Sequence, residues 1–372
     1  MSPGPAYDPP HRSPDTTPEW LKNEGDCSDV VLSSRVRLAR NLAGVPFAFK
    51  ATSKDRQRSL DACRDQILLA NVAPRIIWEE LHERPAVTRS LLVERHLISK
   101  QHSKGRGGIG AADDPRAVAY SAPDERLAIM VNEEDHLRVQ TIRSGLALAE
   151  AWAAADRVDD MLEAGLDYAY SPRFGYLTAC PTNVGTGVRM SVMMHLPGLR
   201  LTGDIDKVKR AASDMSLAVR GFYGEGSEAV GDLYQISNQV SFGRAEHTTL
   251  HELQSEIVPR VVEYERLARR ELLTKRRMGL EDQLWRAWGT LTNARLLTTE
   301  EAMQLLSLAR LGGLVGVLPA ERAAARTVNA LWLLVQPAHL QKALGQELDQ
   351  EQRRVARATL VRERLGGTSP AR

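Results

Sequence analysis

The spacing of apolar residues divides the chain into a first part that mixes helices with short strands and a second part that contains helices alone. In residues 53–70, apolar positions such as Leu60 and Ile67 recur at helical intervals, and Thr52 just before them is a start signal for a helix. The same periodicity predicts two further helices in the first part, at residues 146–162 and 204–215.

Short apolar or alternating runs between these helices predict strands. The predicted strands cover residues 90–98, 117–121, 127–131, 137–142, 176–179, 188–195, 217–223 and 233–240. Most of them follow one another without an intervening helix, which disfavours βαβ alternation and predicts a mainly antiparallel sheet. The expected fold class of this part is therefore α+β, a mainly antiparallel sheet flanked by helices.

From residue 247 onward the pattern is helical only. The predicted helices cover residues 250–275 (with a kink at Pro259), 281–288, 299–310, 320–334, 337–344 and 350–365. A length of 372 residues agrees with two domains. We place an α+β domain at residues 18–260 and an all-helical C-terminal domain at 261–372. The proline-rich start, residues 1–17, is expected to be a disordered leader.

Composition narrows the class of protein further. With 43% hydrophobic and 26% charged residues and a net charge of +2, the chain is typical of a globular protein and does not indicate direct binding of nucleic acid. Its three cysteines, Cys27, Cys63 and Cys180, lie far apart, so neither a disulfide framework nor zinc-ligand spacing is present, and a reducing cytoplasm fits. No apolar run is long enough to cross a membrane.

Two clusters carry candidate chemistry. Cys180, Asn183, Gly185, Gly187 and Arg189 fall within ten residues. Glycines let a backbone approach a ligand closely, and an arginine beside them offers a planar fork to phosphate oxygens. A turn that leads into the next strand is the simpler interpretation of this cluster alone.

The second cluster is the run from Asn132 to Arg138, which places four acidic or imidazole groups in a row. Charged residues are almost never buried unless they are paired, so this run is not an ordinary packed element. Together with the thiol cluster it favours a functional site over a simple turn.

Five motifs in chain order resemble those of the guanidino kinases, which move a phosphoryl group between ATP and a guanidinium. They are the two clusters above, Ser33-Ser34-Arg35-Val36-Arg37, Arg220-Gly221-Phe222-Tyr223-Gly224-Glu225 and Tyr234-Gln235-Ile236-Ser237-Asn238-Gln239. Within that superfamily the sequence is similar to the bacterial protein arginine kinases, from about residue 20 to 365. Only 32 residues precede Ser33, whereas the small-molecule kinases carry a helical domain there.

The resemblance implies a set of residues that hold ATP. They are Ser33, Ser34, Arg35, Val36, Arg37, His96, Arg138, Arg189, Met190, Ser191, Val192, Met193, Arg220, Gly221, Phe222, Tyr223 and Gly224. Arg35 and Arg37 alternate on one predicted strand, so both side chains point to the same face. Five guanidinium groups and a Mg²⁺ ion would neutralise the phosphates without having to reorganise. Taken singly, each arginine is equally well explained by a surface salt bridge, and His96 by a half-buried histidine.

The resemblance also implies the groups that handle the acceptor guanidinium. Two carboxylates can hold it, orient one nitrogen and accept a proton as the N–P bond forms. Glu225 is the expected general base and Glu134 its partner, with Glu133 as the alternative if the register shifts by one and Glu228 as a weaker candidate. Which acidic group reaches Mg²⁺ is left open.

Cys180 matches the reactive cysteine of the family, and a thiolate there would add to the charge that complements the guanidinium. Its simpler interpretation is a buried small hydrophobic residue. Asn183 is expected to support the turn or the substrate.

The last predicted helix contains a third candidate site. In protein arginine kinases an Arg-Asp-x-x-Arg-Ala segment binds phosphoarginine and supports allosteric control. Here the matching residues are Arg353, Arg354 and Arg357, so an arginine replaces the aspartate. Arg353 and Arg357 lie at i, i+4 on one helix face. A solvated basic face explains them equally well.

The resemblance implies a cytoplasmic protein arginine kinase that uses ATP and Mg²⁺ and forms a homodimer. Its implied partners are protein substrates, an activator protein, a Clp ATPase whose protease degrades the marked proteins, and a heat-shock repressor. Two alternatives remain open: a kinase for free arginine or another small guanidino compound, and a non-catalytic reader of phosphoarginine.

Overall fold

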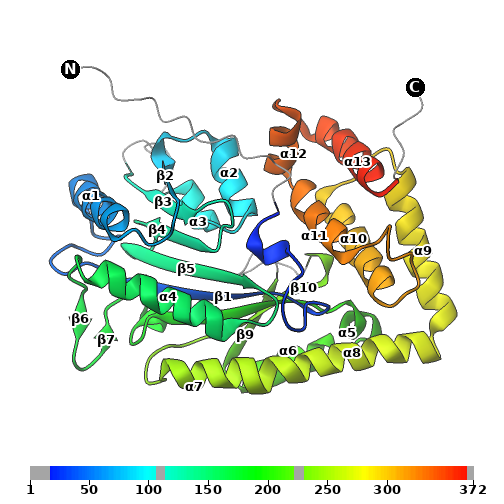
Figure 1. Cartoon of the computed structure of the whole chain (residues 1–372), viewed down its shortest axis with the longest axis horizontal. Coiled ribbons are helices and arrows are strands. Elements are labelled where there is room, and N and C mark those ends of the chain that lie inside the picture. Colours follow the sequence, from blue (N-terminus) through cyan, green and yellow to red (C-terminus); the bar gives the residue numbers. More distant parts are fainter. Residues whose placement is uncertain (1–16, 106–113, 222–229, 367–372) are drawn as a thin grey trace.

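The computed structural model describes residues 17–105, 114–221 and 230–366. Within these residues, one eight-stranded sheet spans the molecule in the order β2-β3-β4-β5-β1-β8-β10-β9, and every neighbouring pair is antiparallel (Figure 1). The strands are β1 (Val31–Arg40), β2 (Ile76–Glu80), β3 (Ala117–Ser121), β4 (Leu127–Val131), β5 (Leu137–Ser144), β8 (Val188–His195), β9 (Leu217–Gly221) and β10 (Leu233–Asn238). A separate hairpin pairs β6 (Tyr170–Ser171) with β7 (Gly175–Tyr176). The predicted α+β class is confirmed.

One face of the sheet is covered by long helices that share a single hydrophobic core with it. They are α1 (Ser53–Ala70), α4 (Leu148–Glu163) and α8 (Val258–Lys275). Helix α1 has the predicted bounds because Thr52 caps it: the Thr52 side chain accepts from the backbone of Asp55, whose carboxylate accepts from Thr52 in return. Val36 of β1 and Val192 of β8 point into this core.

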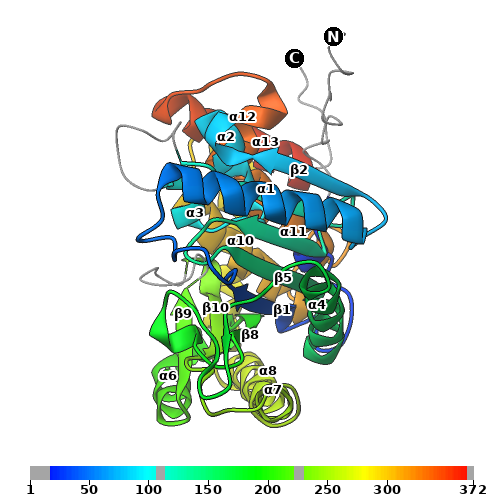
Figure 2. The ribbon, with the colours of Figure 1, turned by 90° about the vertical axis from the view of Figure 1, so that its left-hand side faces the viewer.

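On the opposite face, C-terminal helices pack against one half of the sheet in a second core. The C-terminal helices are α9 (Arg277–Asn293), α10 (Thr299–Leu314), α11 (Ala325–Leu334), α12 (Pro337–Leu344) and α13 (Gln350–Gly366). Their fully buried Trp332 belongs to the same cluster as Leu32, Met193 and Leu233 of the strands. The two views show these helices stacked beside the sheet, with α12 next to α2 (Ala86–Glu94) at the top (Figures 1 and 2).

The remaining helices are short connections. They are α3 (Lys100–Lys104), α5 (Pro197–Thr202), α6 (Ile205–Asp214) and α7 (Glu246–His251). A π-helical turn, Glu252–Ile257, joins α7 to α8 where the sequence predicts a kink at Pro259. The expected domain boundary at residue 260 falls inside α8, whose Val261 and Ala268 still pack in the first core.

Two sequence expectations about local structure are wrong. Residues 90–98, predicted as a strand, form the second half of α2 and the turn after it, because Pro85 starts a helix that buries Leu92 against the sheet. Residues 177–179, predicted as part of a strand, lie outside β7. Strand β2, at the sheet edge, has no counterpart among the predicted strands. Nearly all of the expected leader, residues 1–17, lies outside the described residues.

Candidate active site

Four strands of the sheet place five arginines around one cavity of about 500 Å³. The five lining arginines are Arg35 and Arg37 on β1, Arg138 on β5, Arg189 on β8 and Arg220 on β9. Because alternate residues of a strand share a face, Arg35 and Arg37 point together into the cavity. The register sets Arg37 directly opposite Arg189 across the β1–β8 pair. The predicted convergence of the five guanidinium groups is therefore found in the structure.

The electrostatics of this face favour a bound anion. Burial, reinforced by the neighbouring Arg189 and Arg138, lowers the pKa of Arg35 to about 10. The same causes hold the pKa of Arg37 well below its ordinary value. Arg35 is fixed in place by hydrogen bonds to Ser191 Oγ (3.3 Å) and Gln235 Oε1 (2.8 Å), two neutral acceptors. A guanidinium keeps its proton in proteins, so the cluster carries positive charge that a polyanionic ligand would neutralise.

Acidic residues meet the arginines at one end of the cavity. Arg138 contacts Glu133 at 2.8 Å and Glu134 at 3.0 Å. Burial raises the pKa of Glu133, but its ion pair with Arg138 helps to outweigh burial and holds the pKa below its ordinary value. Glu134 differs: burial and the two adjacent carboxylates raise its pKa in spite of the contact with Arg138. The side chain of Glu134 is 41% exposed and that of Glu133 only 2%, so Glu134 is the carboxylate open to a ligand.

The rest of the acidic run is structural. Asp135 Oδ1 accepts hydrogen bonds from Asn41 Nδ2 and from the backbone N–H of Ala179, both at 2.7 Å. His136 Nδ1 accepts from the backbone of Leu42 at 3.0 Å. Asp135 therefore fixes the backbone just before Cys180, and residues 132–137 are buried except for Glu134.

Cys180 lies at the edge of the same cavity, together with Asn183. It precedes a short 3₁₀ turn, Pro181–Asn183, whose start is closed by the backbone bond from Asn183 N–H to the Cys180 carbonyl (3.0 Å). The thiol lies 3.0 Å from Thr182 Oγ1 and is partly exposed. It lines the same cavity as Glu134, which agrees with a role toward the acceptor rather than in the core.

His96 lines the cavity from a loop that follows α2. Its backbone is left-handed (φ +60°), and its ring meets Trp20 edge to face at 4.6 Å. Burial, together with the nearby Arg35 and Lys100, lowers its pKa to about 3, so the imidazole is neutral. A neutral ring at the rim of the cationic cavity is suited to contact the uncharged part of a nucleotide.

Several predicted residues do not line the cavity with their side chains. Val36, Met190 and Val192 point into the core on the other face, and Ser34 Oγ donates to the carbonyl of Gly145. Ser33, Ser191 and Met193 lie in a small adjoining cavity beside His96. Gly221 is the last described residue of β9. Phe222, Tyr223, Gly224, Glu225 and Glu228 lie outside the described residues.

The structure also adds cavity residues that sequence reasoning did not select. They are Ser99, Lys100, Gln101, Gln140, Thr182, Gln235 and Gln239. Gln235 and Gln239 belong to a motif that was recognised but given no role. Ser99 donates to Glu133 at 2.6 Å. It lies three residues after His96, and this closeness in sequence is the signal that could have identified it.

The candidate phosphoarginine residues lie elsewhere, on α13. Arg357 is buried and donates to the carbonyls of Val335 (2.7 Å) and Leu297 (2.8 Å). Arg353 donates to the carbonyl of Leu348, and Arg354 pairs with Glu351 at 2.7 Å. Arg357 is therefore engaged by the protein itself, and phosphoarginine binding at this helix stays a prediction.

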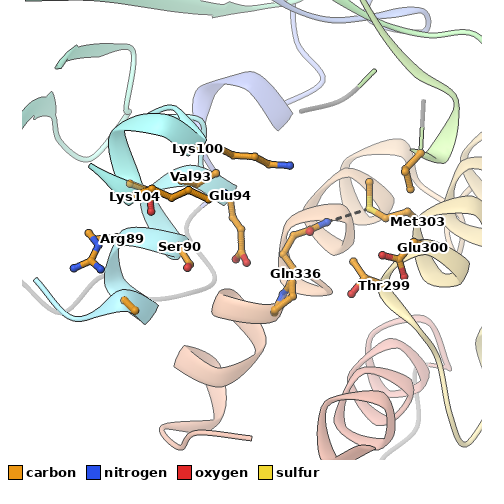
Figure 3. Close-up of a pocket in the computed structure, with 14 residues that line it drawn as sticks. Arg89, Ser90, Val93, Glu94, Lys100, Lys104, Thr299, Glu300, Met303 and Gln336 are labelled. Carbon is orange, nitrogen blue, oxygen red and sulfur yellow. Dashed lines mark hydrogen bonds between the residues drawn. The ribbon is translucent and has the colours of Figure 1, made fainter. Parts of the chain in front are cut away.

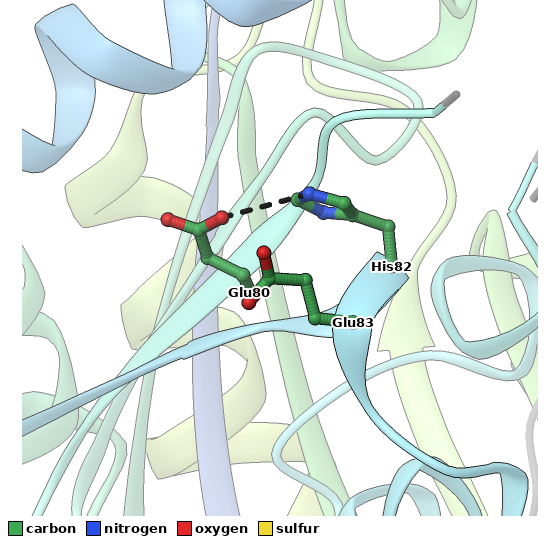
Figure 4. A group of neighbouring side chains, drawn as sticks. All are labelled: Glu80, His82 and Glu83. Atoms are coloured by element: carbon green, nitrogen blue, oxygen red, sulfur yellow. Dashed lines mark ion pairs between the residues drawn. The ribbon is translucent and has the colours of Figure 1, made fainter. Parts of the chain in front are cut away.

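Two further features were considered as sites. Among the described residues, one group has metal-ligand spacing: Glu80, His82 and Glu83 at the end of β2, where Glu80 and His82 already form an ion pair (Figure 4). This group lies outside the arginine cavity. A second cavity of about 510 Å³ separates α2 and α3 from α10 and Gln336 (Figure 3). No helix of the described residues is long and apolar enough to cross a membrane.

Comparison with known proteins gives the family. The ATP:guanido phosphotransferase C-terminal catalytic domain matches residues 75–268, and the protein-arginine kinase McsB C-terminal domain matches residues 277–372. A protein-arginine kinase of Symbiobacterium thermophilum is 46% identical over 349 residues, 93% of this chain and 96% of that one. One of Moorella thermoacetica is 43% identical over 356 residues, 94% and 97% of the two chains. The chain belongs to the protein-arginine kinase family.

Solved structures agree with this family at the level of fold. Lombricine kinase is similar with a TM-score of 0.53 and 23% identity, covering 68% of this chain and 71% of that one. The duplicated taurocyamine kinase of Schistosoma mansoni, solved with transition-state analog components, has a TM-score of 0.55 and 24% identity. That likeness covers 68% of this chain and 36% of the duplicated kinase. The guanidino kinase resemblance and the predicted fold are both confirmed.

Proposed function

We propose that this protein-arginine kinase transfers the γ-phosphoryl group of ATP to the guanidinium of arginine side chains in proteins. The observation that carries the proposal is one cavity that combines five arginines with two carboxylates, Glu133 and Glu134, which contact one of those arginines, Arg138. The arginines suit a triphosphate, and the carboxylates suit a guanidinium. The family membership names the reaction that joins them.

Phosphoryl transfer needs positioning and stabilisation of charge more than covalent chemistry by the protein. Arg35, Arg37, Arg138, Arg189 and Arg220 would bind the phosphate oxygens and compensate their charge as it redistributes in the transition state. Four of them lie on β1, β5 and β8 in the middle of the sheet, so these guanidinium groups are held before ATP arrives. His96, which lines the same cavity, would contact the uncharged part of the nucleotide.

A Mg²⁺ ion that accompanies ATP would neutralise part of the phosphate charge and would take an oxygen ligand from the protein. Glu134 would supply it, since its side chain is 41% exposed whereas Glu133 is occupied by Arg138 and Ser99. Oxygen donors of this kind fit Mg²⁺, which binds through one or two carboxylates and the substrate phosphates.

At the acceptor end, Glu134 would hold the guanidinium and align one of its nitrogens with the γ-phosphorus. As the N–P bond forms and the P–O bond to ADP breaks, that nitrogen loses a proton. Glu225 is our candidate for the base that takes it, with Glu134 as the second carboxylate. Cys180 would add negative charge beside the guanidinium if its thiol ionises, and Asn183 would orient the turn that carries it.

The wider role follows from the family and is also a proposal. We expect a cytoplasmic enzyme that acts as a homodimer, marks proteins for a Clp ATPase and its protease, controls a heat-shock repressor and responds to an activator protein. The three cysteines are free, as such a compartment requires.

The test is to incubate the purified protein with Mg-ATP and an unfolded protein, and then to map phosphate by mass spectrometry at neutral pH, because the P–N bond is acid-labile. Phosphate on arginine side chains, lost in Glu225→Ala and Glu134→Gln, supports the proposal. Phosphate that appears only on added free arginine would identify a metabolic guanidino kinase instead. Binding of phosphoarginine proteins without any transfer would identify a reader.

A further inference from the structure

A carboxylate of the catalytic part caps a helix of the C-terminal part. Glu94, the last residue of α2, accepts hydrogen bonds from the backbone N–H groups of Ala338 (2.8 Å) and His339 (2.9 Å) in the first turn of α12. Helix α12 has no side-chain cap of its own. An anion at a helix N-terminus satisfies donors that the helix leaves unpaired and interacts favourably with its dipole. Figure 3 shows Glu94 directed toward the C-terminal segment that carries Gln336.

The ring of His339 adds further contacts between α12 and the end of α2. Its Nδ1 lies 2.7 Å from the Glu94 carboxylate, and its Nε2 lies 3.3 Å from Arg95 Nη1. Burial and the neighbouring Arg95 lower the pKa of His339 in spite of the Glu94 contact, so the ring is neutral. The network then fixes one tautomer: Nδ1–H donates to Glu94, and Nε2 accepts from Arg95. His339 is fully buried, and Glu94 is nearly so.

Arg95 is held from its other side as well. Its Nε lies 2.8 and 2.9 Å from the two carboxylate oxygens of Glu125, and both side chains are buried. Two consecutive residues, Glu94 and Arg95, are therefore locked onto a histidine that lies more than 240 residues further along the chain. A buried network whose members all have partners restricts the backbone that carries it.

The next residue along the chain is His96, at the rim of the active-site cavity. Its left-handed φ of +60° is uncommon for a residue with a side chain and must be held by its surroundings. On the far side its carbonyl accepts from Gln140 Nε2 (2.7 Å), and its N–H donates to the carbonyl of Val93 (3.0 Å). Arg95, which contacts His339, is thus followed directly by His96 at the cavity. The hydrogen bonds on both sides restrict the backbone of His96.

We propose that His339 is a positioning residue for the nucleotide: through Glu94 and Arg95, the C-terminal helices hold His96 in the orientation that receives ATP. The inference rests on the proposed function, because it takes the cavity beside His96 as the nucleotide site. It goes beyond that function in making the affinity for ATP depend on a contact between the two parts of the chain. A displacement of α12 would release α2 and weaken nucleotide binding while the five arginines stay in place.

The experiment uses the full-length protein with His339→Ala, His339→Asn and a control, Arg326→Ala. Asparagine places an N–H group near the position of Nδ1, so it can still donate to Glu94. Arg326 also joins the C-terminal helices to the first part of the chain, through Glu24 and the carbonyl of Lys22, but it does not touch α2. Direct binding of Mg-ADP is measured by calorimetry, together with the KM for ATP, kcat and the KM for the protein substrate.

We expect His339→Ala to weaken Mg-ADP binding and raise the KM for ATP by about tenfold, with kcat at saturating ATP and the KM for the protein substrate close to wild type. His339→Asn should recover most of the affinity, and Arg326→Ala should match wild type. If His339→Ala does not fold, the Mg-ADP affinities of His339→Asn and Glu94→Gln are compared instead. Glu94→Gln keeps the shape of the side chain but removes the charge that caps α12, so it should bind Mg-ADP more weakly than His339→Asn.

Equal Mg-ADP affinity in folded wild type and His339→Ala would overturn the positioning role. If kcat fell and the KM values for ATP and for the protein substrate both changed in every variant, the positioning role would also be overturned. That result would indicate general destabilisation. If the wild type itself binds no Mg-ADP, the proposed function fails first, and that outcome is distinct from either of the others.

Discussion

Arg37 on β1 and Arg189 on β8 are direct register partners across an antiparallel pair, so two positive charges face each other beside the cavity. Like charges in this position destabilise a sheet. A third arginine of the cavity, Arg138, contacts two carboxylates, Glu133 at 2.8 Å and Glu134 at 3.0 Å. The arrangement is consistent with a site whose charge is completed by its ligand.

Replacing one member of this pair should separate stability from function. We expect Arg189→Met to raise the free energy of unfolding without ligand by about 0.5–1 kcal/mol and to abolish stabilisation by Mg-ATP. Urea unfolding with and without nucleotide measures both. Arg277→Met, which removes an exposed arginine of α9, serves as the control and should change neither. Undiminished nucleotide stabilisation in Arg189→Met would contradict the assignment of this face.

Replacing Glu134 should mainly lower activity, whereas replacing Glu133 should also lower stability. Glu134→Gln is expected to lower the rate of arginine phosphorylation by about 10²–10⁴-fold with little change in unfolding, because its side chain is partly exposed. Glu133→Gln removes a buried charge that binds Arg138 and Ser99, so it should also reduce stability by about 1.5–3 kcal/mol. Rates and urea midpoints of both variants test this contrast. A stable, fully active Glu134→Gln would show that Glu133 is the acceptor carboxylate.

The pH dependence should reveal Glu134. Its pKa is raised, and only the ionised carboxylate can hold a guanidinium, so activity should fall as pH decreases through that raised value. The acidic limb of kcat/KM for the protein substrate is therefore expected at a higher pH than an ordinary glutamate gives. A pH series on wild type and on the residual activity of Glu134→Gln checks the assignment, since the limb should be missing in the variant.

Cys180 should be the thiol that reports on the site. Cys63 is fully buried, and burial raises its pKa, whereas Cys180 is partly exposed at the cavity edge. Iodoacetamide is expected to label Cys180 and inactivate the enzyme, with protection by Mg-ADP and an arginine peptide together. Cys180→Ala should lower kcat/KM by about tenfold, equivalent to about 1.4 kcal/mol. Peptide mapping of the label tests this, and labelling without loss of activity would place the thiol outside the reaction.

The sequence predicted the sheet and the five converging arginines because both depend on local signals, the alternation of side chains along strands and short motifs. It failed at residues 90–98, where an apolar run fits a buried strand as well as a helix. It also missed the structural role of Asp135, because its partners Asn41 and Ala179 lie more than 40 residues away in either direction. The Glu94–His339 contact was equally out of reach, since it depends on how the C-terminal helices dock.

The last helix offers a test of the phosphoarginine hypothesis. Arg357 donates to two backbone carbonyls in the interior, so Arg357→Met should reduce stability by about 1–3 kcal/mol whether or not a ligand binds there. Arg354 is different: its partner is the exposed Glu351, and replacing it should cost little stability. Arg354→Asp restores a carboxylate that can bond the guanidinium part of phosphoarginine, and it should increase affinity for that ligand in a calorimetric titration. An unchanged isotherm, with the fold intact, would show that Arg353 and Arg354 form a solvated basic face and that Arg357 holds the helix in place.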